Sequence, residues 1–75
     1  MTLFYDWLIA KYRKKDGSFK DNRFGDLAAD AFNDPFFPRD AVIGQPVLDY
    51  LRRCGACKEC IETFKDAWRK YRNWE

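Results

Sequence analysis

The sequence predicts an all-α domain, and three observations lead to that prediction. Apolar residues recur at helical spacing in four stretches, no stretch alternates as a strand would, and proline or glycine marks several of the boundaries. At 75 residues the chain can form only one domain. Its composition, 47% hydrophobic and 19% aromatic, can fill a core and excludes a disordered chain. We therefore expect a single helical domain over residues 1–75.

The first two helices are expected over residues 3–14 and 22–33. Thr2 can cap the first helix, and Asp21 or Asn22 can cap the second. The second helix has an apolar stripe at positions i, i+3, i+4, i+7 and i+8, which defines its buried face. This stripe comprises Phe24, Leu27, Ala28, Ala31 and Phe32.

Phe32 provides a test of that helical phase. If its ring is buried, replacement by alanine should destabilise the domain by about 3 to 5 kcal/mol. Pro35 disfavours helical dihedrals at the residue before it, so the helix should end at or before residue 33. The adjacent rings of Phe36 and Phe37 then lie on an extended turn, where neighbouring side chains face different ways and only one needs to be buried.

The last two helices are expected over residues 46–54 and 57–72, separated by a short turn. Pro46 suits the first position of a helix, and Gly55 can adopt the left-handed conformation that closes one. An apolar stripe with a period of 3.6 runs along the fourth helix. It comprises Cys57, Cys60, Ile61, Phe64, Trp68 and Tyr71. The expected fold is therefore a compact bundle of four short helices around an aromatic core.

Residues spread over nearly the whole chain resemble the YozE family in their order and spacing. They are Phe4, Tyr5, Asp6, Trp7, Leu8, Leu27, Ala28, Ala31, Phe32, Asp34, Phe37, Pro38, Tyr50, Leu51, Phe64, Ala67, Trp68 and Tyr71. This is a family of small bacterial proteins of uncharacterised function. The resemblance implies a fold similar to the sterile alpha motif, and it supplies no catalytic residues. The three cysteines are not part of the pattern, so any function that rests on them would be particular to this chain.

The pattern Cys54-x-x-Cys57-x-x-Cys60 has the spacing of some iron–sulfur sites. Such a cluster, or a structural zinc ion, usually takes four ligands, whereas this chain has no histidine and no further cysteine. We therefore expect packed or incidental thiols and no cofactor, with a metal or redox role as the alternative. A Cys57–Cys60 disulfide inside a helix would need strained geometry, although a helix N-terminus favours a thiolate at Cys57.

Three carboxylates recur at a spacing of four residues, at Asp26, Asp30 and Asp34. The first two share a helix face, and the third lies at the end of the helix. Such a face is more often solvated or turned to a partner than used for cation binding or acid–base catalysis. The candidate partner surface combines these acids with exposed aromatic rings. Its members are Asp26, Asp30, Asp34, Phe36, Phe37 and Trp74.

Basic residues gather toward both ends of the chain, around an acidic middle. If the helix ends converge, these cations could contact phosphates. The candidate nucleic-acid surface comprises Lys14, Lys15, Arg52, Arg53, Arg69 and Lys70. A net charge of only +2 and the interleaved acids weaken this interpretation.

The sequence lacks the usual signs of an enzyme, because it has no histidine, no catalytic triad and no glycine-rich phosphate loop. An odd number of cysteines fits reduced thiols, and the N-terminus does not have the plan of a signal peptide. No apolar run approaches the roughly 20 residues that cross a bilayer. We expect a cytoplasmic, non-catalytic module that contacts another protein and not a membrane. Nucleic-acid binding is the alternative, and a thiol or metal role is the second alternative.

Overall fold

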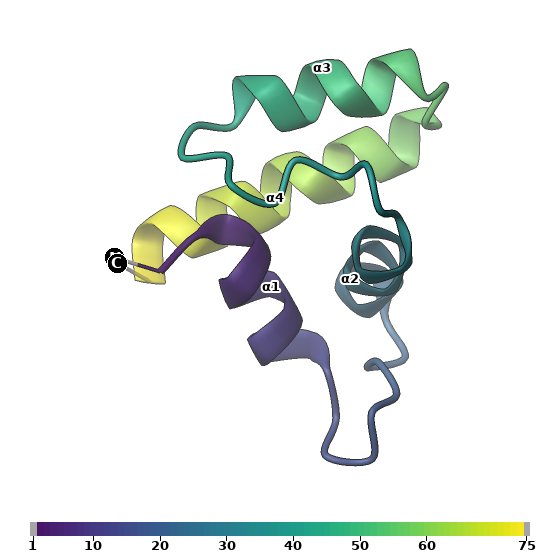
Figure 1. Ribbon diagram of the computed structural model, residues 1–75, viewed down its shortest axis with the longest axis vertical. Helices are drawn as coiled ribbons and strands as arrows, with labels where there is room; N and C mark the ends of the chain where they lie inside the picture. Colours follow the sequence, from purple (N-terminus) through teal and green to yellow (C-terminus); the bar gives the residue numbers. More distant parts are fainter. Residues whose placement is uncertain (1, 75) are drawn as a thin grey trace.

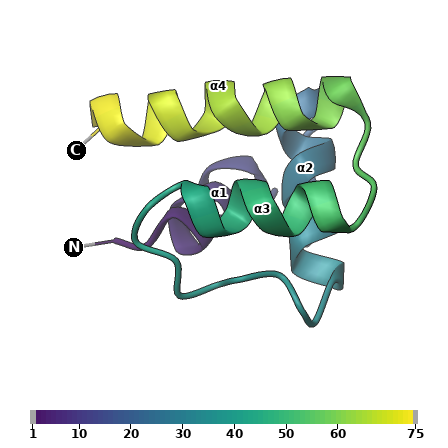
Figure 2. The same ribbon diagram turned by 90° about the horizontal axis from the view of Figure 1, so that it is seen from above.

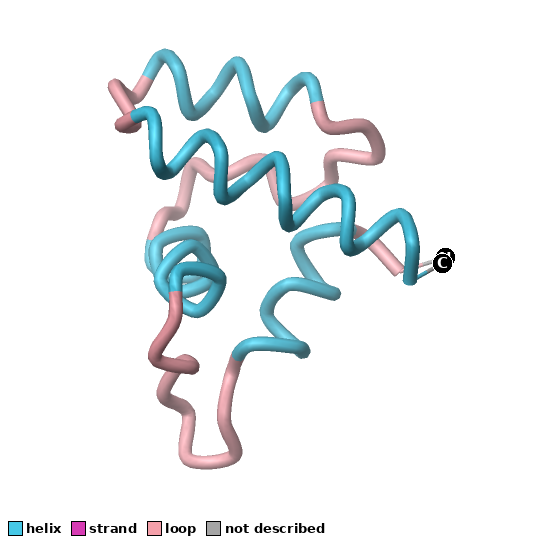
Figure 3. The backbone as a smooth tube through the Cα atoms, turned by 180° about the vertical axis from the view of Figure 1, so that it is seen from behind, coloured by secondary structure: helices cyan, strands magenta, loops and turns pink. Residues whose placement is uncertain are grey.

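A computed structural model of the protein describes residues 2–74 and contains four helices. These are α1 (Phe4–Tyr12), α2 (Arg23–Asn33), α3 (Gln45–Arg53) and α4 (Lys58–Trp74). No strand occurs among the described residues, in which helices alternate with loops (Figure 3). The prediction of an all-α fold is therefore confirmed. None of the helices in this range combines the length and the apolar character that crossing a membrane requires.

The long helix α4 packs against each of the other three helices, and α1 also packs against α2. α3 lies beside α4 and runs in the opposite direction (Figure 2). α1 and α2 cover the other side of α4 (Figure 1). The chain returns from α2 to α3 along an extended path beside α3, so that residues 34–44 form one edge of the molecule.

The core is an aromatic cluster centred on Phe4, whose side chain is only 1% exposed. Its ring lies 4.9 Å from that of Trp68, 5.5 Å from that of Phe64 and 5.6 Å from that of Tyr71, measured between ring centroids. The Tyr71 hydroxyl also donates a hydrogen bond to the backbone carbonyl of Thr2. This bond ties the beginning of the described chain to its last helix.

Local sequence signals account for the start of α2 and the end of α3. Asn22 caps α2 as predicted, because its side-chain oxygen accepts a hydrogen bond from the Gly25 amide at 2.8 Å. At the end of α3, Gly55 has φ +75°, and its amide and that of Ala56 donate to carbonyls of the last turn. This is the glycine closure expected from the sequence.

The first helix differs from its prediction at both ends. Leu3, not Thr2, is the N-cap residue, and no side chain caps α1. The helix also ends two residues early, at Tyr12. The cause is a tight turn, in which the Lys20 amide donates to the Tyr12 carbonyl at 2.8 Å and Arg13 pairs with Phe19 in an isolated antiparallel bridge. The hydrogen bonds of this turn satisfy backbone groups that would otherwise pair within a further turn of helix, so α1 ends there.

The prediction that Phe32 belongs to the core is wrong, because the residue is 37% exposed. Its ring packs against that of Phe19, 5.7 Å away between centroids, and the Arg13 guanidinium lies over it at 4.6 Å. α2 turns Leu27, Ala28 and Ala31 to its neighbours instead. The apolar stripe of α2 is therefore wider than the face that is buried, and Phe32 lies at its edge.

Candidate functional site

A groove of about 300 Å³ lies between α2, α3 and the turn that joins α3 to α4. We call it the α2–α3 groove. Its buried lining residues are Leu27, Ala31, Phe37 and Leu51. Its more exposed lining residues are Asp30, Asp34, Tyr50, Cys54, Ala56, Cys57 and Cys60. The groove thus has an apolar floor, and its rim brings together carboxylates and thiols that come from separate stretches of the sequence.

The Asp34 carboxylate accepts two hydrogen bonds, one within the segment after α2 and one from α3. Asp34 is the C-cap residue of α2, and one of its carboxylate oxygens accepts the Phe36 amide at 3.0 Å. The other oxygen accepts the hydroxyl of Tyr50. The bond from Tyr50, and then that from Phe36, lowers the pKa of the Asp34 carboxyl. The same bond raises the pKa of the Tyr50 hydroxyl, with a smaller contribution from the neighbouring Cys54.

Sequence reasoning missed the role of Tyr50. It identified the residue only as part of the family pattern. The partners Asp34 and Tyr50 are 16 positions apart in the chain. Neither residue type is unusual at such a place, so no sequence signal indicates that the two side chains meet.

Tyr50→Phe should reduce the stability of the domain more at neutral pH than in acid. A carboxyl with a lowered pKa contributes stability that is present above its unfolded pKa, about 3.9, and is lost as pH falls through the lower folded pKa. Without the tyrosine hydroxyl, the pKa of folded Asp34 moves back toward its unfolded value, and this contribution shrinks. Urea unfolding of both proteins between neutral pH and about pH 2 measures the effect.

Asp34→Asn is the matched control, because it removes the titrating group and leaves Tyr50 in place. In the Asp34→Asn background, adding Tyr50→Phe should leave the pH dependence of unfolding unchanged. If Tyr50→Phe still changed the acid slope there, the hydroxyl would act on some other carboxyl.

The acidic residues of α2 continue the rim beyond the α2–α3 groove. Asp26 and Asp30 are both exposed and line a second, adjoining groove of about 190 Å³ together with Glu59 of α4. Asp30 belongs to both grooves. The basic member of the second groove, Arg23, forms an ion pair with Asp66 at 2.9 Å. The structure therefore brings the three predicted carboxylates together along one side of α2.

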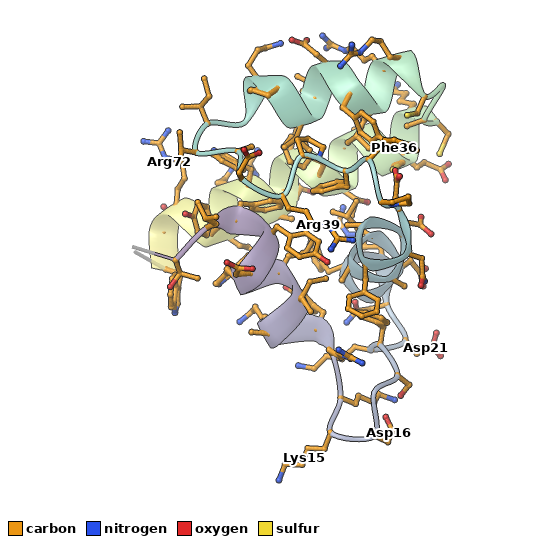
Figure 4. All side chains as sticks on the ribbon, viewed as in Figure 1. Lys15, Asp16, Asp21, Phe36, Arg39 and Arg72 are labelled. Carbon is orange, nitrogen blue, oxygen red and sulfur yellow. The ribbon has the colours of Figure 1, made fainter. Side chains whose placement is uncertain are left out.

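The predicted aromatic members of this surface separate into three environments. Phe37 is 5% exposed and packs against Tyr5 and Tyr50, so it belongs to the groove floor. Phe36 is 80% exposed, and Figure 4 shows it on the segment after α2. Trp74 is 56% exposed but lies in another hollow, of about 350 Å³, with Thr2, Trp7, Ala10 and Lys11. Of these three predicted members, Phe36 is the one that is both exposed and adjacent to the acidic rim, where its amide donates to Asp34.

The candidate nucleic-acid residues lie on three separate parts of the fold. Lys14 and Lys15 lie in the loop after α1, and Figure 4 places Lys15 at its tip. Arg52 and Arg53 end α3, at the end of the molecule opposite to the last turns of α4 (Figure 2). The remaining pair, Arg69 and Lys70, lies in those last turns.

The last pair also has partners within the protein. Arg69 forms an ion pair with Asp66 at 3.2 Å, and the Lys70 amine lies 5.5 Å from the centre of the Phe24 ring. The six cations thus do not gather on one helix or at one end of the ribbon.

The three thiols lie around the α3–α4 turn, and the placement of Cys57 differs from the prediction. Cys57 precedes α4 and is exposed, whereas the sequence placed it inside the fourth helix on its buried stripe. Cys60 is half-buried, and burial, followed by the proximity of Cys57 and Asp30, raises the pKa of its thiol. Within residues 2–74, no group of three or more cysteine, aspartate or glutamate side chains is arranged to hold a metal ion.

The fold defines the class of protein as a small, all-helical domain in which three short helices pack against a longer last one. Residues 4–73 match the YozE SAM-like fold family, and the chain belongs to that family. The resemblance found in the sequence is thereby confirmed. No curated protein and no solved structure gives a significant match.

Proposed function

We propose that the protein is a cytoplasmic, non-catalytic module that binds another protein through the α2–α3 groove and the Phe36 ring. The observation that carries this proposal is the 80% exposure of Phe36 next to a groove with an apolar floor and an acidic rim. An aromatic ring left in water at such a place is typical of a contact site. Trp74, at the other hollow, is not part of the proposed surface.

The chemistry of the groove favours a particular kind of partner. Leu27, Ala31 and Leu51 offer an apolar floor that suits an aliphatic or aromatic side chain. Asp30 and Asp34 on the rim favour lysine or arginine next to that side chain. A basic, partly apolar segment of a protein fits both requirements. The same carboxylates repel phosphate groups, which supports protein over nucleic acid as the ligand of this surface.

Phe36→Ser and Asp30→Asn should each weaken partner binding by about tenfold or more, because central aromatic and charged contacts dominate interface energies. Both side chains are exposed, so neither change should alter the melting temperature much. The partner is captured from native lysate on the immobilised chain, with and without nuclease, and the Kd of each variant is then measured with the purified partner.

Trp74→Ser is the matched control, since it also removes an exposed aromatic ring but lies outside the groove. It should leave the Kd unchanged. Capture that disappears after nuclease treatment, or a partner whose affinity depends on Trp74 and not on Phe36, would contradict the proposal.

A further inference from the structure

The position of Cys57 relative to α4 changes what its thiol can do. α4 begins at Lys58, and the Ile61 amide donates to the Cys57 carbonyl at 3.1 Å. Cys57 is therefore the N-cap residue, and Cys60 is the third residue of the helix. The side chain of an N-cap residue reaches toward the residue three positions on, as in a capping box. The strain expected of a disulfide within a helix does not apply, because the Cys57 side chain precedes the helix.

The two thiols also differ in exposure. Cys57 is exposed and open to a reagent from solution, while Cys60 is half-buried behind it. The two residues stand three positions apart at the start of α4, and both line the α2–α3 groove. The third thiol, Cys54, is exposed and belongs to the C-cap residue of α3, before the turn that leads to α4. The placement at the start of one helix thus pairs Cys57 with Cys60, whereas Cys54 belongs to the end of another helix.

We infer that Cys57 and Cys60 form a redox-active dithiol, which exchanges with small disulfides of the glutathione type to give a reversible Cys57–Cys60 disulfide. The inference is independent of the proposed function. The exposed Cys57 is the attacking group, and Cys60 is the resolving group. Both thiols line the α2–α3 groove, so the exchange would change the wall of that groove.

The exchange proceeds in two balanced steps. First, the Cys57 thiolate attacks one sulfur of the small disulfide. A sulfur–sulfur bond forms to Cys57, and the other half of the disulfide leaves as a thiolate. Second, the Cys60 thiol gives its proton to solvent and attacks the Cys57 sulfur, which releases the second small thiolate. The protein loses two electrons and two protons, and the small disulfide is reduced to two thiols.

The sequence contains an internal control for this inference. Cys54-x-x-Cys57 and Cys57-x-x-Cys60 have the same spacing, so in an unfolded chain the two disulfides should form to a similar extent. In the folded protein, the Cys57–Cys60 bridge should exceed the Cys54–Cys57 bridge by about tenfold or more, because Cys57 and Cys60 share the start of α4, whereas Cys54 lies across the turn at the end of α3 and disulfide geometry is specific. The ratio of the two bridges therefore reports the effect of the fold.

The experiment equilibrates the full chain in a buffer of reduced and oxidised glutathione, with and without urea. Remaining thiols are alkylated in acid, and the protein is digested with trypsin for mass spectrometry. Cleavage after Lys58 places Cys57 and Cys60 on different peptides, so their bridge joins residues 54–58 to 59–65, whereas a Cys54–Cys57 bridge stays within one peptide. Reduction of the joined pair by added thiol shows that the bridge is reversible.

Three variants identify the bridge. Cys54→Ser should retain the joined peptides in full, while Cys57→Ser and Cys60→Ser should lose them. Equal amounts of the two bridges in the folded protein, or loss of the joined peptides in Cys54→Ser, would overturn the inference. The inference would also be overturned if the folded protein failed to form the Cys57–Cys60 bridge under conditions in which the unfolded chain forms it.

Discussion

Replacing Phe4 with alanine is expected to destabilise the domain by about 3 to 5 kcal/mol, which is comparable to the total stability of a small domain. The ring is 1% exposed and touches aromatic side chains from α1 and α4. Its removal opens a cavity at the point where these helices meet, and large rings around it cannot easily collapse into the space. Urea unfolding followed by tryptophan fluorescence and far-ultraviolet circular dichroism measures the loss.

Phe32→Ala is the matched control, because it deletes the same ring from a residue that is 37% exposed. With less apolar surface buried, the expected loss is about 1 to 2 kcal/mol. Equal losses at Phe4 and Phe32 would show that the packing around one of them is different from that described.

Gly25→Ala is expected to destabilise the domain by about 3 kcal/mol, although alanine normally favours a helix. A β-carbon at this position would lie 1.8 Å from the carbonyl oxygen of Lys20 and 2.7 Å from its carbonyl carbon. Both are backbone atoms, so no side-chain rotation relieves the overlap. The start of α2 would have to move away from the preceding turn, which would also break the Asn22 cap on the Gly25 amide. Thermal and urea unfolding measure the loss.

Gly55→Ala separates steric overlap from backbone conformation. A β-carbon there meets nothing within 4 Å, but φ is +75°. We expect a loss of about 1 to 2 kcal/mol, from the left-handed conformation alone. If Gly25→Ala were the milder of the two changes, the close approach of Lys20 to α2 would not be a constraint on the fold.

The parts of the fold that could be predicted from the sequence are those governed by local signals. Asn22 caps α2, Pro35 follows its end and Gly55 closes α3, because each acts through its own backbone or that of its neighbours. The apolar stripes of α2 and α4 indicated the helices for the same reason. The grouping of Asp26, Asp30 and Asp34 also followed from helical spacing.

Features that depend on tertiary contacts could not be predicted in this way. Periodicity shows which residues share a face but not how much of that face a neighbouring helix covers, and so Phe32 was misplaced. The bond between Tyr50 and Asp34 joins distant parts of the chain. The sequence predicts that the fourth helix starts at Cys57, which would bury its thiol. α4 starts one residue later, and the Cys57 thiol is exposed at the N-cap. Helix boundaries are rarely predicted to that accuracy.

The hydrogen bond from Tyr71 to Thr2 has a practical consequence for experiments on this protein. It keeps the two ends of the described chain together, beside the last turn of α4. The α2–α3 groove adjoins the first turn of the same helix, at Cys60, roughly 20 Å away along its axis. Thr2 and Trp74, the first and last described residues, thus lie at the end of α4 away from the groove, which makes the termini the preferred places for a tag, a dye or a surface attachment. The chain can be immobilised by either end with its acidic rim, Phe36 and its thiols facing solution.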